Sequence, residues 1–256
     1  LFGVDDVSAA QTAQEFYKTI NKAPFFKTTI ENAELIKVAY NTFISTKISM
    51  INTLMETCHY LPNTNVDDIT EALSLCTTRL ISKKYLYGGM GDGGGCHPRD
   101  NIALSHLARK LKLSYNWYDN IMRQRESQTE WLADLIIENK GDRQINILGK
   151  TFKPETNLVT GSPSILLKNI LEEKGETVRM WDPYVDNSDI MKVKDEYEWD
   201  KIPQLFFIGT QHKAFTEFYF MPNSVVIDPF RYLTVHDNVK YIPIGDNIWK
   251  SKSGKQ

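Results

Sequence analysis

The chain has 256 residues, 41% of them hydrophobic and 11% aromatic, which is enough to bury the core of one large domain or two smaller ones. Its 30 basic and 32 acidic residues give a formal charge of −2, so the positive surplus needed to bind nucleic acid or an anionic membrane surface is missing. The sequence shows neither a signal peptide nor an apolar run long enough to span a membrane, and we expect a cytoplasmic protein.

The first thirty residues predict a single β-α-β unit. A strand is expected at 1–4, a helix at 8–21 and a second strand at 25–30. Such a unit is too small to fold alone. The chain also begins without methionine, at Leu1, and we expect it to be an excerpt of a longer protein.

Residues 31–140 are predicted to be entirely helical. Apolar residues at three-and-four spacing indicate four helices: at 32–58, from an N-cap at Asn65 through Leu73, at 101–111, and at 118–140, where Gly141 ends the last. From residue 141 to 256 the pattern alternates between strands and helices. Strands are expected at 145–148, 177–181, 205–208 and 225–228, with a helix at 163–174. The expected fold class is therefore α/β, a helical domain followed by a Rossmann-like, doubly wound parallel sheet.

A dense glycine cluster precedes one cysteine. Six of the 14 glycines fall within eight residues before Cys96: Gly88, Gly89, Gly91, Gly93, Gly94 and Gly95. Glycine permits positive φ and close approach of the backbone to a ligand, so the cluster predicts the wall of a substrate pocket. A merely flexible loop is the alternative. Residues 89–94 also satisfy the GxGxxG dinucleotide pattern, but Pro98 and Asp100 come before the expected helix, and we reject an NAD site there.

The three cysteines are predicted to differ in reactivity. Cys96 precedes a helix and lies near Arg99, and both features favour the thiolate. Cys58 and Cys76 are expected on apolar helical faces as inert core residues. An odd number of cysteines without CxxC spacing argues against disulfides and structural zinc, and a metal site at the Cys-His pairs is a minor alternative. Asp100 suits either an N-cap or a catalytic role.

A polar strip runs along the first long helix. Glu34, Lys37, Asn41 and Ser45 recur at three-and-four spacing. This strip is either a solvated face or the lining of a cleft. We expect it to face Cys96 across a cleft between the helical and α/β domains.

Three motifs, in order, resemble those of the UDP-glucose/GDP-mannose dehydrogenase family. Glu34 to Asn41 is similar to its Glu-x-x-Lys-x-x-x-Asn helix, Gly93 to Asp100 to its Gly-Gly-x-Cys-x-Pro-x-Asp motif, and Gly149 to Thr156 to its third signature. Trp181-Asp182-Pro183 also matches an aromatic-Asp-Pro at a strand end. The resemblance implies three parts: a remnant of the NAD-binding domain at 1–30, a helical dimerisation domain at 31–140, and a Rossmann-like nucleotide-sugar-binding domain at 141–256.

The resemblance implies an enzyme that oxidises the sugar C6 alcohol of a nucleotide sugar to a carboxylate with two NAD, as a homodimer through the helical domain. Cys96 would form a thiohemiacetal and a thioester, Lys37 and Asn41 would stabilise the oxyanion, and Asp100 would assist proton transfer or position water. The implied substrate-binding residues are Glu34, Arg79, Gly93, Gly94, Phe152, Lys153 and Arg231; no metal is expected.

Two regions depart from the family pattern. Residues 157–163 lack the acidic and basic residues usual in the third signature, and Asp228 to Arg231 stands where a Gly-Arg pair is common. The NAD domain's glycine fingerprint and catalytic glutamate are also not found, so we expect the chain alone to be inactive. The alternatives are a non-catalytic module that binds a sugar nucleotide and dimerises, or a hydrolase that uses Cys96 with His97 or another histidine.

Overall fold

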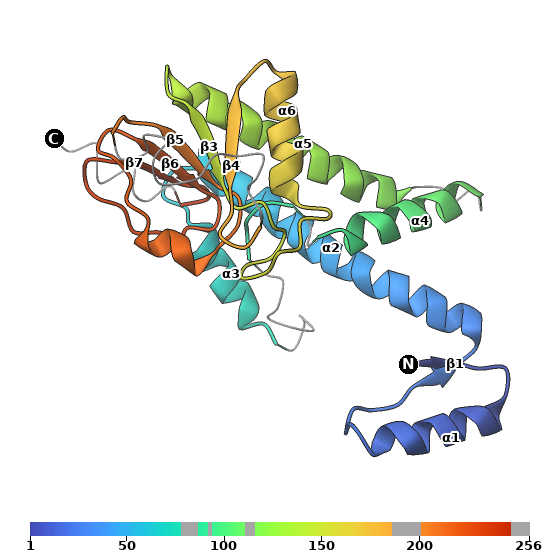
Figure 1. The fold of residues 1–256 in the computed structure, drawn as a ribbon. Coiled ribbons are helices and arrows are strands. Elements are labelled where there is room, and N and C mark those ends of the chain that lie inside the picture. Colours follow the sequence, from blue (N-terminus) through green and yellow to red (C-terminus); the bar gives the residue numbers. More distant parts are fainter. Residues whose placement is uncertain (78–86, 92–93, 111–115, 186–200, 247–256) are drawn as a thin grey trace.

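The computed structural model describes residues 1–77, 87–91, 94–110, 116–185 and 201–246 (Figure 1). A long helix, α2 (Ile30–Tyr60), runs through the molecule. A small N-terminal unit lies at one end of α2 and a parallel sheet at the other, with the remaining helices alongside. No helix among these described residues is long and apolar enough to cross a membrane.

The N-terminal unit is a β-α-β of two short parallel strands, β1 (Phe2–Gly3) and β2 (Lys27–Thr28), joined through α1 (Val7–Lys18). Asp6 caps α1 by accepting the Ser8 N–H at 2.7 Å. The unit is pressed closely onto α2, because a Cβ added at Gly3 would lie 2.7 Å from the Ile30 Cα. The three predicted elements are present, although both strands are shorter than expected.

Three further helices surround α2: α3 (Val66–Ser74), α4 (Cys96–Lys110) and α5 (Trp117–Lys140). The N-cap predicted at Asn65 is confirmed, since its side chain accepts the N–H groups of Asp67 and Asp68. The buried stripe of α2 recurs at three-and-four spacing and packs against α5. It consists of Ile44, Ile51, Met55 and Cys58.

Two sequence predictions in this region are wrong. Helix α4 begins at Cys96 and not at Asn101, because Pro98 fits the first turn of a helix, where an N–H has no intrahelical partner. Asp100 is therefore a buried residue inside α4 and not its N-cap. Cys76 is exposed beyond the end of α3, where it follows the C-cap, and does not lie on an apolar helical face.

The second half of the described chain forms a five-stranded, fully parallel sheet in the order β4-β3-β5-β6-β7. The strands are β3 (Ile145–Leu148), β4 (Val178–Trp181), β5 (Leu205–Ile208), β6 (Val225–Asp228) and β7 (Lys240–Pro243). Helix α6 (Pro163–Glu173) connects β3 to β4, and a short 3-10 turn, η1 (Lys213–Glu217), follows β5. The predicted α/β class is confirmed.

Both faces of this sheet are covered, which explains the continuous apolar runs of its central strands. Leu132 and Ile136 of α5 and Leu167 of α6 are fully buried in the core on one face. A second cluster around Phe206 and Phe215 fills the other. Strand β7 was not predicted, because it has few apolar residues and contains Pro243, which a sheet tolerates at an edge.

Candidate functional site

Asp100 is the centre of a charged cluster between α2 and α4. Its Oδ2 accepts hydrogen bonds from Lys37 Nζ at 2.8 Å and from the Asn41 side-chain amide. Its Oδ1 accepts from Arg99 through Nε at 3.1 Å and NH2 at 3.0 Å. Asp100 is only 3% exposed, whereas the Lys37 side chain is 54% exposed. The cluster thus joins a buried carboxylate to cations that reach solvent.

Burial and hydrogen bonding act in opposite directions on Asp100. Burial favours the neutral acid and raises its pKa, but the hydrogen bonds from Lys37, Asn41 and Arg99 favour the carboxylate, and the net pKa is lowered. The same contact with Asp100 raises the pKa of Arg99. Because two cations face one carboxylate, the immediate surroundings of Asp100 carry a net positive charge.

Cys96 lies beside this cluster. It is the first residue of α4 and is exposed, and Asp100 follows it by four residues on the same face of the helix. The amino-terminal end of a helix carries partial positive charge. Cys58 is buried, and burial raises the pKa of its thiol. Cys76 is also exposed, so exposure alone does not distinguish Cys96.

The polar strip of α2 has two environments. Lys37 and Asn41 contact α4, so they meet Asp100 within the helical region and not across a cleft to the sheet. Glu34, one turn earlier, is exposed. Ser45, one turn later, is fully buried. The strip is therefore neither a uniformly solvated face nor the uniform wall of a cleft.

The glycines before Cys96 pack against side chains of the sheet domain. A Cβ added at Gly89 would lie 2.7 Å from the Phe230 ring, and one at Gly91 would lie 2.8 Å from the Pro163 ring. At Gly94, where φ is +98°, it would lie 2.5 Å from the Phe152 ring. Residues 87–91 and 94–95 thus form the contact between the helical region and the sheet, which favours a requirement for close packing over a freely flexible loop.

Two buried amides, which the sequence analysis missed, fix the same segment. Asn52 of α2 accepts the Gly89 N–H at 3.0 Å and donates to the Gly91 carbonyl at 2.6 Å. Gln128 of α5 donates to the Gly89 carbonyl at 3.0 Å. Asn52 continues the three-and-four spacing of the polar strip along α2, and that periodicity could have identified it.

Phe152 and Lys153 lie in the loop that follows β3. The half-buried Phe152 ring packs on Gly94, and Lys153 is exposed. A cleft of about 620 Å³ lies nearby, between α2, α3 and the carboxyl ends of β5 and β6. Its walls include Asn52, Gly89 and Phe230. In parallel α/β sheets, ligands bind outside the carboxyl ends of the strands.

Arg231 is engaged by the protein itself. Its guanidinium donates to Asp67 of α3 through Nε at 2.6 Å and NH2 at 2.9 Å. It also donates to the carbonyl groups of Pro229, Ile244 and Gly88. The Arg231 side chain is 6% exposed, so in this conformation it joins the sheet to α3 and the glycine segment. A contact of Arg231 with substrate stays a prediction, as do the other substrate-binding roles.

Two of the site residues expected from the sequence, Arg79 and Gly93, lie outside the described residues. Within the described ranges, no group of three or more His, Cys, Asp or Glu side chains is placed to hold a metal ion. The structure therefore brings together Lys37, Asn41, Asp100 and Cys96 in the helical region. Of the remaining candidates, Glu34 lies on α2 and Gly94 lies in the glycine segment (residues 87–91 and 94–95), whereas Phe152, Lys153 and Arg231 lie on the sheet side of that segment.

Two family models match the chain. Residues 31–126 match the central domain of the UDP-glucose/GDP-mannose dehydrogenase family, and residues 146–235 match its UDP binding domain. UDP-glucose 6-dehydrogenase TuaD of Bacillus subtilis is 31% identical over 205 residues, which are 78% of this chain and 44% of that protein. UDP-glucose 6-dehydrogenase of Rickettsia conorii is 25% identical over an aligned length of 271, which covers 97% of this chain and 62% of that protein.

Solved structures give the same result at the level of the fold. A UDP-glucose dehydrogenase from Pyrobaculum islandicum superposes with a TM-score of 0.82 at 26% identity, over 95% of this chain and 57% of that one. A UDP-D-ManNAc dehydrogenase from Pyrococcus horikoshii superposes with a TM-score of 0.78 at 23% identity, over 96% and 59%. The chain thus spans about half the length of the proteins it matches.

Proposed function

Because the chain belongs to the UDP-glucose/GDP-mannose dehydrogenase family, we propose that it is the nucleotide-sugar-binding and cysteine-bearing part of a nucleotide-sugar 6-dehydrogenase. The whole protein would oxidise the C6 hydroxyl group of the sugar to a carboxylate. The observation that supports this most is the Lys37-Asn41-Asp100 cluster, which lies one helical turn from Cys96.

In this proposal the Cys96 thiolate attacks the C6 aldehyde, and an S–C bond forms while the carbonyl oxygen takes on negative charge. Lys37 uses one of its three N–H donors on Asp100, and Asn41 uses one of its two, so each keeps a donor for that oxygen. Asp100 fixes both donors and remains a carboxylate. After oxidation to the thioester, attack by water on the carbonyl carbon releases the thiolate and the product acid.

The nucleotide end of the substrate would lie on the sheet side of the glycine segment. The exposed ammonium of Lys153 suits a pyrophosphate, and the Phe152 ring packs on Gly94, two residues before Cys96. The substrate would then extend along the glycine segment, with its sugar at Cys96 and its phosphates at the loop after β3. The match of residues 146–235 to a UDP binding domain supports this placement.

NAD would accept the two hydrides in the whole enzyme. The glycine string at 89–94 does not fit a dinucleotide cradle, because α4 begins after the string and not within it. In addition, three glycines of this string pack closely against side chains, those of Phe230, Pro163 and Phe152. We therefore assign no residue of the described ranges to NAD.

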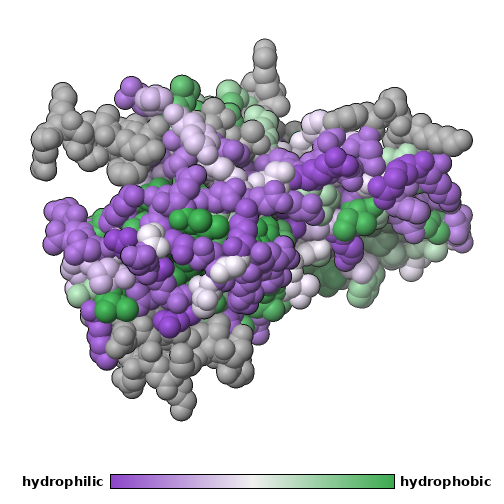
Figure 2. Space-filling model, turned by 90° about the horizontal axis from the view of Figure 1, so that it is seen from above, coloured by the Kyte–Doolittle hydropathy of each residue, from purple (hydrophilic) through white to green (hydrophobic). Residues whose placement is uncertain are grey.

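We also propose that the protein is a cytoplasmic homodimer that associates through its helical region. Figure 2 shows a mostly hydrophilic face with hydrophobic patches set into it. Large apolar side chains are nonetheless exposed on three helices: Tyr40 at 62%, Phe43 at 48% and Met50 at 55% on α2, Ile102 at 55% on α4 and Trp117 at 51% on α5. Such side chains are typical of surfaces that a second subunit covers. Sedimentation equilibrium tests the proposal, and a monomer at micromolar concentration would contradict it.

Thiol labelling tests the assignment of the site, because the chain contains its own control. Cys96 and Cys76 are both exposed, but only Cys96 lies in the proposed site. We expect UDP-glucose, GDP-mannose or a UDP-N-acetylhexosamine to slow alkylation of Cys96 and to leave that of Cys76 unchanged, with mass spectrometry as the readout. Free glucose should protect neither thiol.

Two results would separate the alternatives. If no sugar nucleotide changes the Cys96 rate, Cys96 is not in a nucleotide-sugar site. If Cys96 is protected but a Cys96→Ser whole protein retains full dehydrogenase activity, the thiol is a relic, and the non-catalytic module is the better description of this part.

A further inference from the structure

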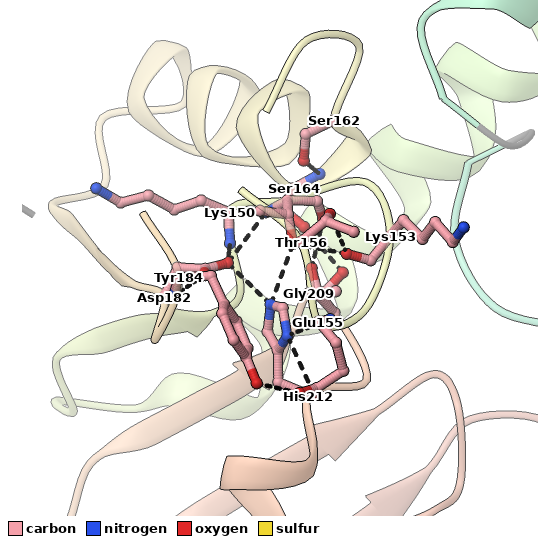
Figure 3. Close-up of polar contacts among 12 residues, drawn as sticks. Lys150, Lys153, Glu155, Thr156, Ser162, Ser164, Asp182, Tyr184, Gly209 and His212 are labelled. Atoms are coloured by element: carbon pink, nitrogen blue, oxygen red, sulfur yellow. Dashed lines mark hydrogen bonds and ion pairs between the residues drawn. The ribbon is translucent and has the colours of Figure 1, made fainter. Parts of the chain in front are cut away.

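A buried histidine lies outside the cysteine site, at the carboxyl ends of β3, β4 and β5 (Figure 3). His212 follows β5 and is fully buried. Its Nδ1 lies 3.0 Å from the Glu155 backbone nitrogen. Its Nε2 lies 3.0 Å from Asp182 Oδ2 and 3.1 Å from Thr151 Oγ1. Both ring nitrogens are therefore engaged by the loops that follow the neighbouring strands.

These partners determine which ring nitrogen of the neutral His212 carries the proton. A backbone N–H can only donate, so Nδ1 accepts from Glu155 and presents a lone pair. The proton is then on Nε2, which donates to the Asp182 carboxylate. Asp182 Oδ2 also accepts the N–H groups of Lys150 and Thr151. Burial raises the pKa of Asp182, but hydrogen bonds from the His212 ring and from the N–H groups of Tyr184 and Lys150 outweigh it and hold the pKa below the usual range.

The same contacts hold both ends of a short segment, residues 150–155. The N–H groups of Lys150 and Thr151 are bound by Asp182 at its start, and the N–H of Glu155 is bound by His212 at its end. Phe152 and Lys153 lie between these two anchors. Glu155 has a φ of +57°, which a residue other than glycine keeps only when its surroundings impose it.

A third contact strengthens the second anchor. The Glu155 carboxylate accepts the Lys213 N–H at 2.7 Å and the Tyr184 hydroxyl. The Tyr184 ring lies beside the imidazole, with 5.0 Å between the centroids. Figure 3 shows the Lys153 side chain extending away from His212, so the histidine holds the backbone of this segment and leaves its functional side chain free.

We propose that His212 is a positioning residue for nucleotide-sugar binding, which sets the backbone of residues 150–155 so that Phe152 and Lys153 can grip the nucleotide. The proposal rests on the proposed function for the role of those two side chains. His212 touches neither Cys96 nor Asp100, so it acts on substrate affinity and not on the reactivity of the thiol.

Two conservative variants separate the two nitrogens of His212. Asparagine places an amide oxygen near the position of Nδ1, so His212→Asn retains the acceptor for the Glu155 N–H and loses the donor to Asp182. Glutamine places its amide near Nε2, so His212→Gln retains the donor and loses the acceptor. His236→Gln is the matched control, since His236 is an exposed histidine of the same domain.

The first readout needs no ligand. We expect the Glu155 amide to exchange its hydrogen faster in His212→Gln than in His212→Asn or His236→Gln, because only glutamine removes its acceptor. Alkylation of Cys96 without ligand should proceed at the wild-type rate in all three. Equal exchange at Glu155 in all three variants would overturn the anchoring role, whatever the ligand of the site is.

The second readout is the Kd of UDP-glucose by calorimetry. Loss of one hydrogen bond that orders the segment should raise Kd about tenfold in His212→Gln, and His212→Asn should stay within about threefold of wild type. If the amide exchanges faster but Kd is unchanged, the segment is anchored by His212 and does not bind the nucleotide, which overturns the proposal. If wild type binds no sugar nucleotide, the proposed function fails while the exchange result stands.

A milder variant covers the case in which neither His212 variant folds. Tyr184→Phe removes one hydroxyl from a side chain that is 44% exposed, so the fold should tolerate it. It should raise Kd about threefold through the loosened Glu155. A Tyr184→Phe protein with wild-type exchange at Glu155 and wild-type Kd would then overturn the proposal.

Discussion

Asp100 keeps its charge inside the protein because Lys37, Asn41 and Arg99 supply donors to both of its oxygens. We expect Asp100→Asn to lower the free energy of unfolding by about 2 kcal/mol at pH 7, as for other hydrogen bonds to a charged group. Urea titration measures this difference. The control is Asp134→Asn, since Asp134 pairs with Lys174 at the surface and such pairs contribute little.

The same residue predicts a pH dependence. The folded pKa of Asp100 is lowered, so its contribution to stability is complete above the unfolded value of about 3.9 and is lost as the pH falls through the folded value. The gap between wild type and Asp100→Asn should therefore be constant from about pH 5 to 7 and shrink below about pH 4. A gap that widens toward acid pH would contradict the assigned contacts.

The sequence motifs identify Lys37, Asn41 and Asp100 as site residues, but they do not predict how these side chains contact one another. The spacing of Lys37 and Asn41 places them on one face of a helix. That Asp100 meets them depends on where α4 begins, and the motif around Cys96 conceals that start because Pro98 is read as a helix breaker although it is acceptable in a first turn. Arg231 shows the same limit, since its partner Asp67 is distant in sequence.

Among the elements, the segment around Gly94 gives the sharpest prediction. Gly94→Ala combines positive φ with a Cβ placed 2.5 Å from the Phe152 ring, and it should lower the free energy of unfolding by about 3 kcal/mol. Gly175→Ala is the matched control, because Gly175 also has a positive φ, of +87°, but has nothing within 4 Å of the added Cβ. It should cost about 1 kcal/mol.

Both variants place alanine at a positive φ, so the difference between their losses of unfolding free energy measures the packing contact separately from backbone strain. Thermal or urea unfolding of both provides the measurement. Equal losses of stability would show that the Phe152 ring moves aside freely. The close contact of the glycine segment with the sheet domain would then not contribute to the free energy of unfolding.

At the scale of elements, periodicity predicted the long helices and the four apolar strands well. It failed where tertiary contacts replace local signals. Strand β7 is an edge strand with Pro243 at its end, so it lacks the apolar alternation that a sequence pattern detects. Strand β2 was predicted at 25–30, but only Lys27–Thr28 pairs with β1. The prediction that Cys76 lies on an apolar helical face was wrong for a related reason, because α3 ends at Ser74.

For the whole molecule, Arg231 links the sheet domain to the helical region. Its side chain is 6% exposed and donates to Asp67 and to three carbonyl groups. Arg231→Met removes the donor to these three carbonyl groups and should lower the free energy of unfolding by about 3 kcal/mol. Arg123→Met is the control, because Arg123 pairs with Asp119 within one exposed helix face and should change stability by about 0.5 kcal/mol or less.

Calorimetry of the two arginine variants also tests whether the molecule unfolds as one unit. If Arg231 joins the two halves, its loss should split a single transition into two, whereas Arg123→Met should keep one transition. A single unshifted transition in Arg231→Met would show that the contacts of Arg231 do not hold the two halves together.

The length of α2 has a consequence for the size of ligand that the protein can hold. At about 1.5 Å per residue this helix is a rod of about 46 Å, with Lys37 and Asn41 toward one end and Met55 packed on Gly88 and Gly245 toward the other. A tilt of about 5° about Met55 would move Asn41 by roughly 2 Å. In the proposed function the substrate extends from Asn41 to Lys153, so the angle between α2 and the sheet sets the length of the molecule that fits between these two residues.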